Sequence, residues 1–338
     1  MCLEHAIVVL SLPTTTAKSG GIILPVGIGA KISIALPEWR CSSLSAFNNP
    51  ESDSTQGGHL KLIASAVLAF STSVHASPVI WDTPQKPFAL YGNTYYVGTA
   101  GISAVLITSP KGHILIDGTG DKGAPIVAEN IRSLGYKLAD VKYILNSHAH
   151  SDHAGGIAEL QKLSGATVVA GRANLATLAS GKASRDDPQY GELPDFEPVT
   201  RLRGISNGEV VAVGPLTVTA HATPGHTPGG TSWTWKSCAN GKCENMVFGD
   251  SVTPNAATNY RYTDHPDTVA SLRQGFAAFE AMPCDILVTA HPEANDLFGR
   301  LQHQAQNGSS AFIDPNACRD LVAYYRQRLD KRLATEKR

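Results

Sequence analysis

Residues 141–163 read VKYILNSHAHSDHAGGIAELQKL, and their pattern indicates the fold class. Its first part, VKYILNS, has the apolar content of a buried strand, and its last part, GGIAELQKL, has the spacing of a helix. Between them, residues 148–153 hold three histidines and one aspartate. A strand that leads directly into a helix is the unit of an α/β protein, and such proteins usually form their sites at strand ends.

Strands and helices alternate along the rest of the chain in two similar halves. The first half starts with short β-rich runs separated by turn signals, which predict an antiparallel start. Helices are expected at residues 124–134, 155–163, 172–180, 267–282 and 316–338, and a second β-rich block covers about residues 209–251. This order predicts a four-layer αβ/βα sandwich, in which two mixed sheets pack face to face with helices outside.

Length and charge limit the classes of partner. The chain has 338 residues, 42% of them hydrophobic, and a formal net charge of −1. It can therefore bury a sizeable core, and its charge gives no indication of a nucleic-acid partner. The bulk of the chain has no apolar run long enough to cross a membrane. We expect a monomer that acts on a small-molecule substrate, with neither nucleic acid nor membrane as partner.

The first quarter of the chain resembles an export signal. Residues 59–78 read HLKLIASAVLAFSTSVHASP, with one basic residue, an apolar run, and small residues before Ser77. This order fits a signal peptide that is cut after Ala76. We expect residues 1–76, an N-terminal extension plus signal peptide, to be absent from the mature protein, and residues 77–338 to form a single periplasmic domain. The other interpretation of the apolar run is a buried core helix or strand.

Four cysteines follow the predicted cleavage site, and an even number in an exported chain indicates disulfides. Four cysteines allow three pairings. Cys238 and Cys243 bracket ANGK, which resembles a hairpin turn, so we expect these two to pair locally and Cys284 to pair with Cys318. The alternative is that some of them are buried free thiols.

Further metal-binding side chains stand at the ends of other predicted strands. The candidate ligands are His148, His150, Asp152, His153, His226 and His291. A catalytic zinc site takes three protein ligands and keeps one position open, so six ligands divide into two such sites. His148 and His150 lie on the same side of an extended segment, which directs Asp152 and His153 toward a second ion. Imidazole and carboxylate ligands without thiolate suit Zn²⁺.

The motifs SHAHSDHAGG, TPGHTPGGTSW, GDS and TAHP together resemble the metallo-β-lactamase superfamily, over about residues 78–333. The resemblance implies the same αβ/βα sandwich. It is closest to the third subclass of class B β-lactamases. His153 completes the histidine cluster, whereas the first subclass has another residue there. Ser251 stands where the first subclass has a metal-binding cysteine.

The resemblance implies two Zn²⁺ ions, one held by His148, His150 and His226 and the other by Asp152, His153 and His291. It implies zinc-dependent hydrolysis of the β-lactam amide bond of penicillins, cephalosporins and carbapenems, which confers antibiotic resistance. Two close zinc ions share a water and lower its pKa enough to make hydroxide at neutral pH. Asp152 has a catalytic role as well, since it can orient this hydroxide.

Other polar residues have candidate roles beside the two metal ions. Ser251 and Thr253 are candidates for binding the substrate carboxylate, the alternative being that they cap the end of a strand. Asp117 is a candidate hydrogen-bond acceptor for the outer nitrogen of a histidine ligand, that is, the ring nitrogen that does not bind the metal. Residues 181–198 form either a wall that contacts the substrate or a plain solvated loop.

Two rival functions follow from the same residues. A superfamily hydrolase of a lactone or thioester, like lactonases or type-two glyoxalases, would use Asp250 to bridge the two metals. A zinc-binding periplasmic protein without activity is the second rival. Three ligands per ion with an open position argue against it.

Overall fold

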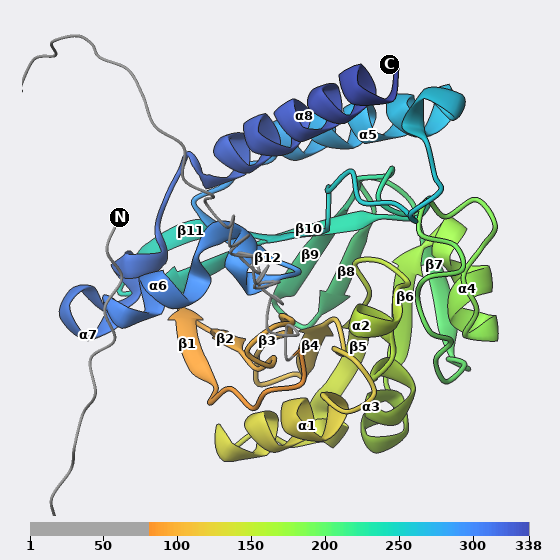
Figure 1. Ribbon diagram of the computed structural model, residues 1–338. Coiled ribbons are helices and arrows are strands. Elements are labelled where there is room, and N and C mark those ends of the chain that lie inside the picture. Colours follow the sequence, from red (N-terminus) through yellow and green to blue (C-terminus); the bar gives the residue numbers. More distant parts are fainter. Residues whose placement is uncertain (1–80, 338) are drawn as a thin grey trace, which may run out of the picture. The chain divides into compact units, whose positions relative to one another are not determined.

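The computed structural model describes residues 81–337, which form two mixed sheets with helices on both outer sides (Figure 1). The first sheet has seven strands in the order β1-β2-β3-β4-β5-β6-β7, antiparallel as far as β4 and parallel beyond it. Its strands are β1 (Phe88–Tyr91), β2 (Thr94–Tyr96), β3 (Val105–Ile107), β4 (His113–Ile116), β5 (Val141–Leu145), β6 (Thr167–Gly171) and β7 (Leu202–Ile205). The predicted antiparallel start is therefore correct.

The second sheet has five strands in the order β12-β11-β10-β9-β8. Only the pair of β11 and β12 is parallel. Its strands are β8 (Val210–Val213), β9 (Leu216–Ala222), β10 (Thr231–Ala239), β11 (Lys242–Gly249) and β12 (Ile286–Thr289). β10 and β11 form a hairpin, in which Cys238 lies opposite Cys243.

Helices cover the outer sides of both sheets. The first half of the chain contributes α1 (Ala124–Ser133), α2 (Ser151–Ala154), α3 (Ile157–Ser164) and α4 (Leu175–Ser180), and the second half contributes α5 (Pro266–Glu280), α6 (Leu297–Gln302), α7 (Gln304–Asn307) and α8 (Ala317–Glu336). In Figure 1, α1 and α3 cover the outer side of the first sheet, and α5 and α8 cover that of the second. Helix α6 packs against the cluster between the sheets. The predicted four-layer αβ/βα sandwich is confirmed.

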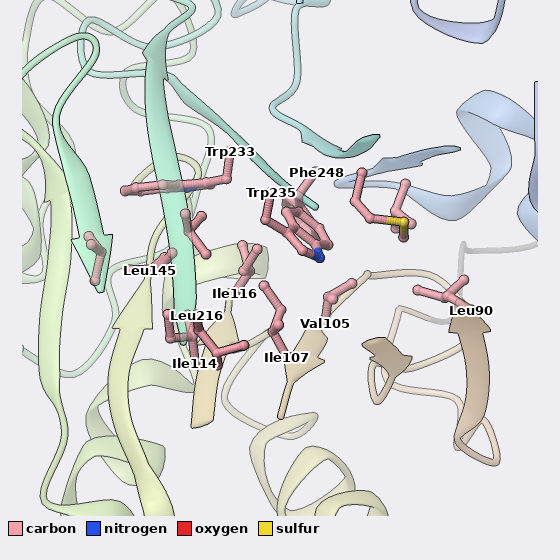
Figure 2. Close-up of a cluster of buried hydrophobic side chains, with 14 of the residues drawn as sticks. Leu90, Val105, Ile107, Ile114, Ile116, Leu145, Leu216, Trp233, Trp235 and Phe248 are labelled. Carbon is pink, nitrogen blue, oxygen red and sulfur yellow. The ribbon is translucent and has the colours of Figure 1, made fainter. Parts of the chain in front are cut away.

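Three apolar clusters separate the four layers, because both faces of the central strands are buried. In β11, Met246 and Phe248 belong to the cluster between the sheets, whereas Val247 points to α5 and α8. Successive side chains of a strand point to opposite faces, so a strand buried on both faces has an almost continuous apolar sequence. Figure 2 shows the cluster between the sheets, where Trp233 and Phe248 meet apolar side chains of the first sheet such as Ile116.

Both predicted disulfides are present. Cys238–Cys243 closes the β10–β11 hairpin, and Cys284–Cys318 joins the segment before β12 to the first turn of α8. The second disulfide therefore ties the helix layer to the strand that leads to His291.

Several elements of the fold were not predicted from the sequence, and one prediction concerns residues that the structure does not describe. Strands β1 and β7 and helices α2, α6 and α7 were not predicted, and residues 172–180 form a 3₁₀ turn followed by α4 instead of one helix. The predicted signal peptide and extension, residues 1–76, lie outside the described residues. None of the helices in residues 81–337 combines the length and apolar character needed to cross a bilayer.

Candidate metal centre

The candidate ligands converge from three strand ends. His148 and His150 follow β5, and Asp152 and His153 lie on the short helix α2. The remaining two, His226 and His291, follow β9 and β12 of the other sheet. The site therefore forms where the ends of the two sheets meet.

The first group of ligand atoms comes from His148, His150 and His226, and these atoms lie within 4.8 Å of one another. All three side chains are buried, at 0%, 4% and 4% exposure. The second group is His148, Asp152 and His153, so His148 is common to both groups. Within residues 81–337, buried imidazole and carboxylate donors thus form two adjacent groups that fit divalent cations.

His148 is oriented by Asp250. Its Nδ1 lies 2.8 Å from Asp250 Oδ1, so Nδ1 carries the proton and donates a hydrogen bond to the carboxylate. Its Nε2 is buried and has no hydrogen-bond partner among the described residues. A buried nitrogen lone pair without a hydrogen-bond partner destabilises the protein in the absence of metal. A metal ligand, however, needs such a free lone pair to bind the cation. This orphaned atom is the observation on which the fit to a metal ion rests.

His150 and His226 are held in the same manner by other oxygen atoms. His150 Nε2 lies 2.9 Å from Asp187 Oδ2, which leaves Nδ1 for a cation. His226 Nδ1 lies 3.1 Å from the Thr253 carbonyl oxygen and 2.9 Å from its hydroxyl, which leaves Nε2. A carbonyl oxygen only accepts hydrogen bonds, so Nδ1 of His226 carries the proton. Outer partners of this kind fix the tautomer and direction of a metal ligand.

The predicted second ligand set also lies together. Asp152 Oδ2 is 3.1 Å from His153 Nε2 and 3.3 Å from His291 Nε2, and these two nitrogens are 3.1 Å apart. Asp117 is fully buried, and its Oδ2 lies 3.5 Å from His153 Nδ1. Its carboxylate accepts hydrogen bonds from the Ser147 backbone and hydroxyl, at 2.7 and 2.5 Å. Asp117 is thus placed against the outer nitrogen of His153.

The electrostatics of the two groups differ. Burial, followed by the charges of the neighbouring histidines, holds the pKa of His148 well below its ordinary value. Burial and then His150 lower the pKa of His226 to about 3. Rings with such pKa values are neutral at pH 7 and have a lone pair available for a cation.

His153 and Asp152 form a strongly coupled pair. Burial alone would lower the pKa of His153, but the carboxylates of Asp152 and Asp117 outweigh it and raise the pKa to about 10. Burial would likewise raise the pKa of Asp152, yet His153 and His291 hold it well below its ordinary value. Carboxylates that favour a proton on His153 would equally favour a divalent cation beside it.

The remaining predicted residues lie close to the centre. Asp250 is 1% exposed, and its Oδ2 is 3.4 Å from the Thr223 hydroxyl. It belongs to neither ligand group of the described chain. Ser251 follows β11 and is 7% exposed. The hydroxyl of Thr253 lies against His226, as described above.

Two cavities open beside the centre. One of about 490 Å³ is lined by Asp152 and by the aromatic side chains of Trp81 and Phe196. The other, of about 600 Å³, is lined by Thr253 and His291. Phe196 belongs to the predicted loop of residues 181–198, so this loop does line a cavity at the centre.

Asp187, which contacts His150, was not predicted from the sequence. The residue lies in a polar loop with neither helical nor strand periodicity, 37 positions after His150. Its only sequence signal was the pair of adjacent aspartates at 186 and 187 in a proline-containing stretch.

The sandwich and its two ligand groups define a metalloprotein with its site at the ends of two facing sheets. A family model described as the metallo-beta-lactamase superfamily matches residues 97–291, more than half of the 338 residues. The chain belongs to this superfamily, and it is an enzyme of the hydrolase class.

Solved structures narrow the resemblance from the superfamily to particular metallo-β-lactamases. The metallo-beta-lactamase SMB-1, bound to 2-mercaptoethanesulfonate, is 57% identical with a TM-score of 0.75, over 76% of this chain and 99% of that one. MEM-A1, a subclass B3 metallo-beta-lactamase from a soil metagenome library, is 54% identical with a TM-score of 0.74, over 76% and 98%. The predicted resemblance to the third subclass of class B is confirmed.

Curated relatives are more distant. The lactamase-like protein nscB of Trichophyton verrucosum is 30% identical over 198 residues, 56% of this chain and 59% of that protein. The N-acyl homoserine lactonase AttM of Agrobacterium fabrum is 29% identical over 157 residues, 38% of this chain and 57% of that protein. The chain thus spans little more than half the length of these relatives.

Proposed function

We propose that this protein is a zinc-dependent β-lactamase that opens the amide bond of penicillins, cephalosporins and carbapenems and so confers antibiotic resistance. The observation that carries the proposal is the pair of adjacent ligand groups that share His148. The fold around these ligand groups also supports the proposal, because a subclass B3 enzyme that is 54% identical has the same fold.

His148, His150 and His226 would hold one Zn²⁺, and Asp152, His153 and His291 the other. When bound, the two ions lower the pKa of a water molecule and polarise the carbonyl oxygen of the substrate. In the reaction, the oxygen of water bonds to the lactam carbonyl carbon, the C–N bond breaks, and a proton passes to the nitrogen.

The protein residues position the reactants. The Asp152 carboxylate lies between His153 and His291 and would accept a hydrogen bond from the attacking water, which fixes the direction of its lone pair. When the Thr253 hydroxyl accepts a hydrogen bond from His226 Nδ1–H, its own hydrogen is free to donate to the substrate carboxylate. Ser251, at the end of β11, would donate to the same carboxylate.

The aromatic side chains of Trp81 and Phe196 would exclude water on one side of the centre, since both line the cavity that contains Asp152. A drier site strengthens each electrostatic contact with the substrate. The substrate is a small molecule, and we propose that the enzyme acts as a monomer in the periplasm, exported by the segment at residues 59–78.

The test is an assay of the purified chain with a penicillin, a chromogenic cephalosporin, a carbapenem, a lactone and a thioester. We expect β-lactam turnover that dialysis against a chelator abolishes and added zinc restores. His150→Ala should lower kcat/KM by at least about 100-fold, because it removes one of three ligands. His303→Ala, at an exposed position away from the centre, is the control and should leave turnover unchanged.

Hydrolysis of the lactone or thioester without β-lactam turnover would replace this proposal by the rival one. The lactonase AttM is the relative that makes this comparison necessary. The position of Asp250 favours the β-lactamase, because its Oδ1 lies on the outer nitrogen of His148 instead of between the two ligand groups. Turnover that survives complete metal removal would refute both.

A further inference from the structure

The loop of residues 181–201, here called the covering loop, contains one buried carboxylate. Asp187 is 7% exposed, whereas the neighbouring Arg185 and Asp186 are exposed. An ionised carboxylate is expensive to bury unless it is paired and hydrogen-bonded. The hydrogen-bond partners of Asp187 therefore indicate the role of this buried carboxylate.

Asp187 joins a metal ligand to the turn of its own loop. Its Oδ2 lies 2.9 Å from His150 Nε2, and its Oδ1 accepts a hydrogen bond from the Gln189 backbone N–H at 2.8 Å. Its carbonyl oxygen also accepts from the Tyr190 N–H at 3.0 Å. One side chain thus closes the loop's turn and fixes which nitrogen of His150 faces the centre.

The covering loop has a second attachment that does not involve His150. The Pro188 carbonyl oxygen accepts a hydrogen bond from the Ala257 N–H at 2.8 Å. The exposed Glu192 carboxylate accepts from the backbone and hydroxyl of Thr258, at 2.5 and 2.7 Å. The chain therefore offers a way to loosen the loop while the contact between Asp187 and His150 stays intact.

We propose that Asp187 is a positioning residue that couples zinc binding at His150 to the order of the turn at residues 187–190 of the covering loop. This inference rests on the proposed zinc site. A cation on Nδ1 withdraws electron density from the imidazole and makes Nε2–H a stronger donor to Asp187. Zinc binding then tightens the turn at Gln189, and by linkage an ordered turn raises the affinity for zinc by the same factor.

The test compares Asp187→Ala and Asp187→Asn with Asp186→Asn, which changes the exposed neighbouring carboxylate. The dissociation constant for Zn²⁺ is measured by competition with a chromogenic chelator. We expect Asp187→Ala to weaken zinc binding about 10- to 100-fold, as loss of an outer partner of a ligand does. Asp187→Asn keeps an acceptor without charge and should show a smaller loss, and Asp186→Asn should match the unchanged chain.

Hydrogen exchange of the Gln189 amide gives a second readout, independent of activity. In the unchanged chain, zinc should slow this exchange, because the amide donates to Asp187 Oδ1. In Asp187→Ala, zinc should no longer change it. Glu192→Ala should speed exchange in the part of the covering loop outside this turn, but it should leave Gln189 exchange unchanged and zinc affinity within about twofold, since Asp187 keeps its contacts with His150 and Gln189.

Two results would overturn the coupling. One is zinc affinity in Asp187→Ala within twofold of the unchanged chain. The other is a loss in Glu192→Ala as large as that in Asp187→Ala, which would assign the effect to the whole loop. Neither measurement uses a substrate. Failure of the coupling is therefore distinguishable from failure of the β-lactamase proposal, which turnover alone decides.

Discussion

The two disulfides should contribute unequally to stability, because they close loops of different length. Cys284–Cys318 spans a sequence separation of 34 and Cys238–Cys243 a separation of 5. The chain-entropy relation gives about 3.8 kcal/mol for the longer loop and about 2 kcal/mol for the shorter one. We therefore expect replacement of the longer disulfide to cost about 1.5 to 2 kcal/mol more than replacement of the local one.

The perturbation is a pair of double variants, Cys284→Ala with Cys318→Ala, and Cys238→Ala with Cys243→Ala. The long-range variant leaves a small cavity as well, since Cys318 of α8 is 2% exposed and belongs to the apolar cluster that α8 shares with α5 and the second sheet. This cavity adds to the loss, so the entropy difference is a lower bound. The local pair lies in a hairpin turn and serves as the matched control.

The assay is equilibrium unfolding in guanidinium chloride, with both variants and the unchanged chain under identical zinc conditions. The slope of the transition shows whether the unfolded state has become more expanded, as removal of a cross-link allows. A loss in the local variant equal to or greater than that in the long-range variant would refute the reasoning from loop length. It would show that the hairpin, and not the link between α8 and β12, limits stability.

Three further changes test other parts of the chain. Asp250→Asn should weaken zinc binding about 10- to 100-fold in a chelator titration, because His148 loses a charged partner; a far greater loss would indicate that Asp250 is itself a ligand. The Arg300 hydrogen bond lowers the pKa of Asp314, so its stabilisation is present above the unfolded pKa and is lost as pH falls through the folded value. Asp314→Asn should then cost about 0.2 to 1 kcal/mol at pH 7 and nothing near pH 2 in thermal unfolding. Gly249→Ala would place a methyl carbon 2.5 Å from an aromatic ring of α5, and denaturant titration should show a loss of about 1 to 3 kcal/mol.

Local patterns were sufficient to predict most of the sandwich. Strands such as β5 and β12 are short apolar runs bounded by turn signals, and α5 and α8 have helical spacing, so each could be identified without its neighbours. The edge strand β7 has the sequence LRGI, and three of its four residues are only partly buried. An edge strand of this kind has no alternating pattern, because its position comes from pairing with β6.

The metal centre, too, could be predicted only in part, because some of its features depend on adjacent residues and others on residues distant in sequence. His148, His150, Asp152 and His153 could be predicted together because they are adjacent in sequence. The choice of nitrogen on each ring could not be predicted, since it depends on Asp250, 102 positions from His148, and on Asp187, 37 positions from His150. Such contacts arise only from the packing of loops on the finished sandwich.

The origin of these outer partners links the centre to the assembly of the whole fold. His148 follows a strand of the first sheet, but Asp250, which orients it, follows β11 of the second. Conversely, His226 follows β9, and the side-chain amide nitrogen of Gln189, from the first half of the chain, lies 3.4 Å from its Nε2, the nitrogen that faces the metal centre and not an outer one. Each half of the chain therefore supplies ligands together with groups that contact the ligands of the other half. A change that shifts one sheet against the other should reduce zinc affinity even when all six candidate ligands are retained, because their orientation depends on both sheets.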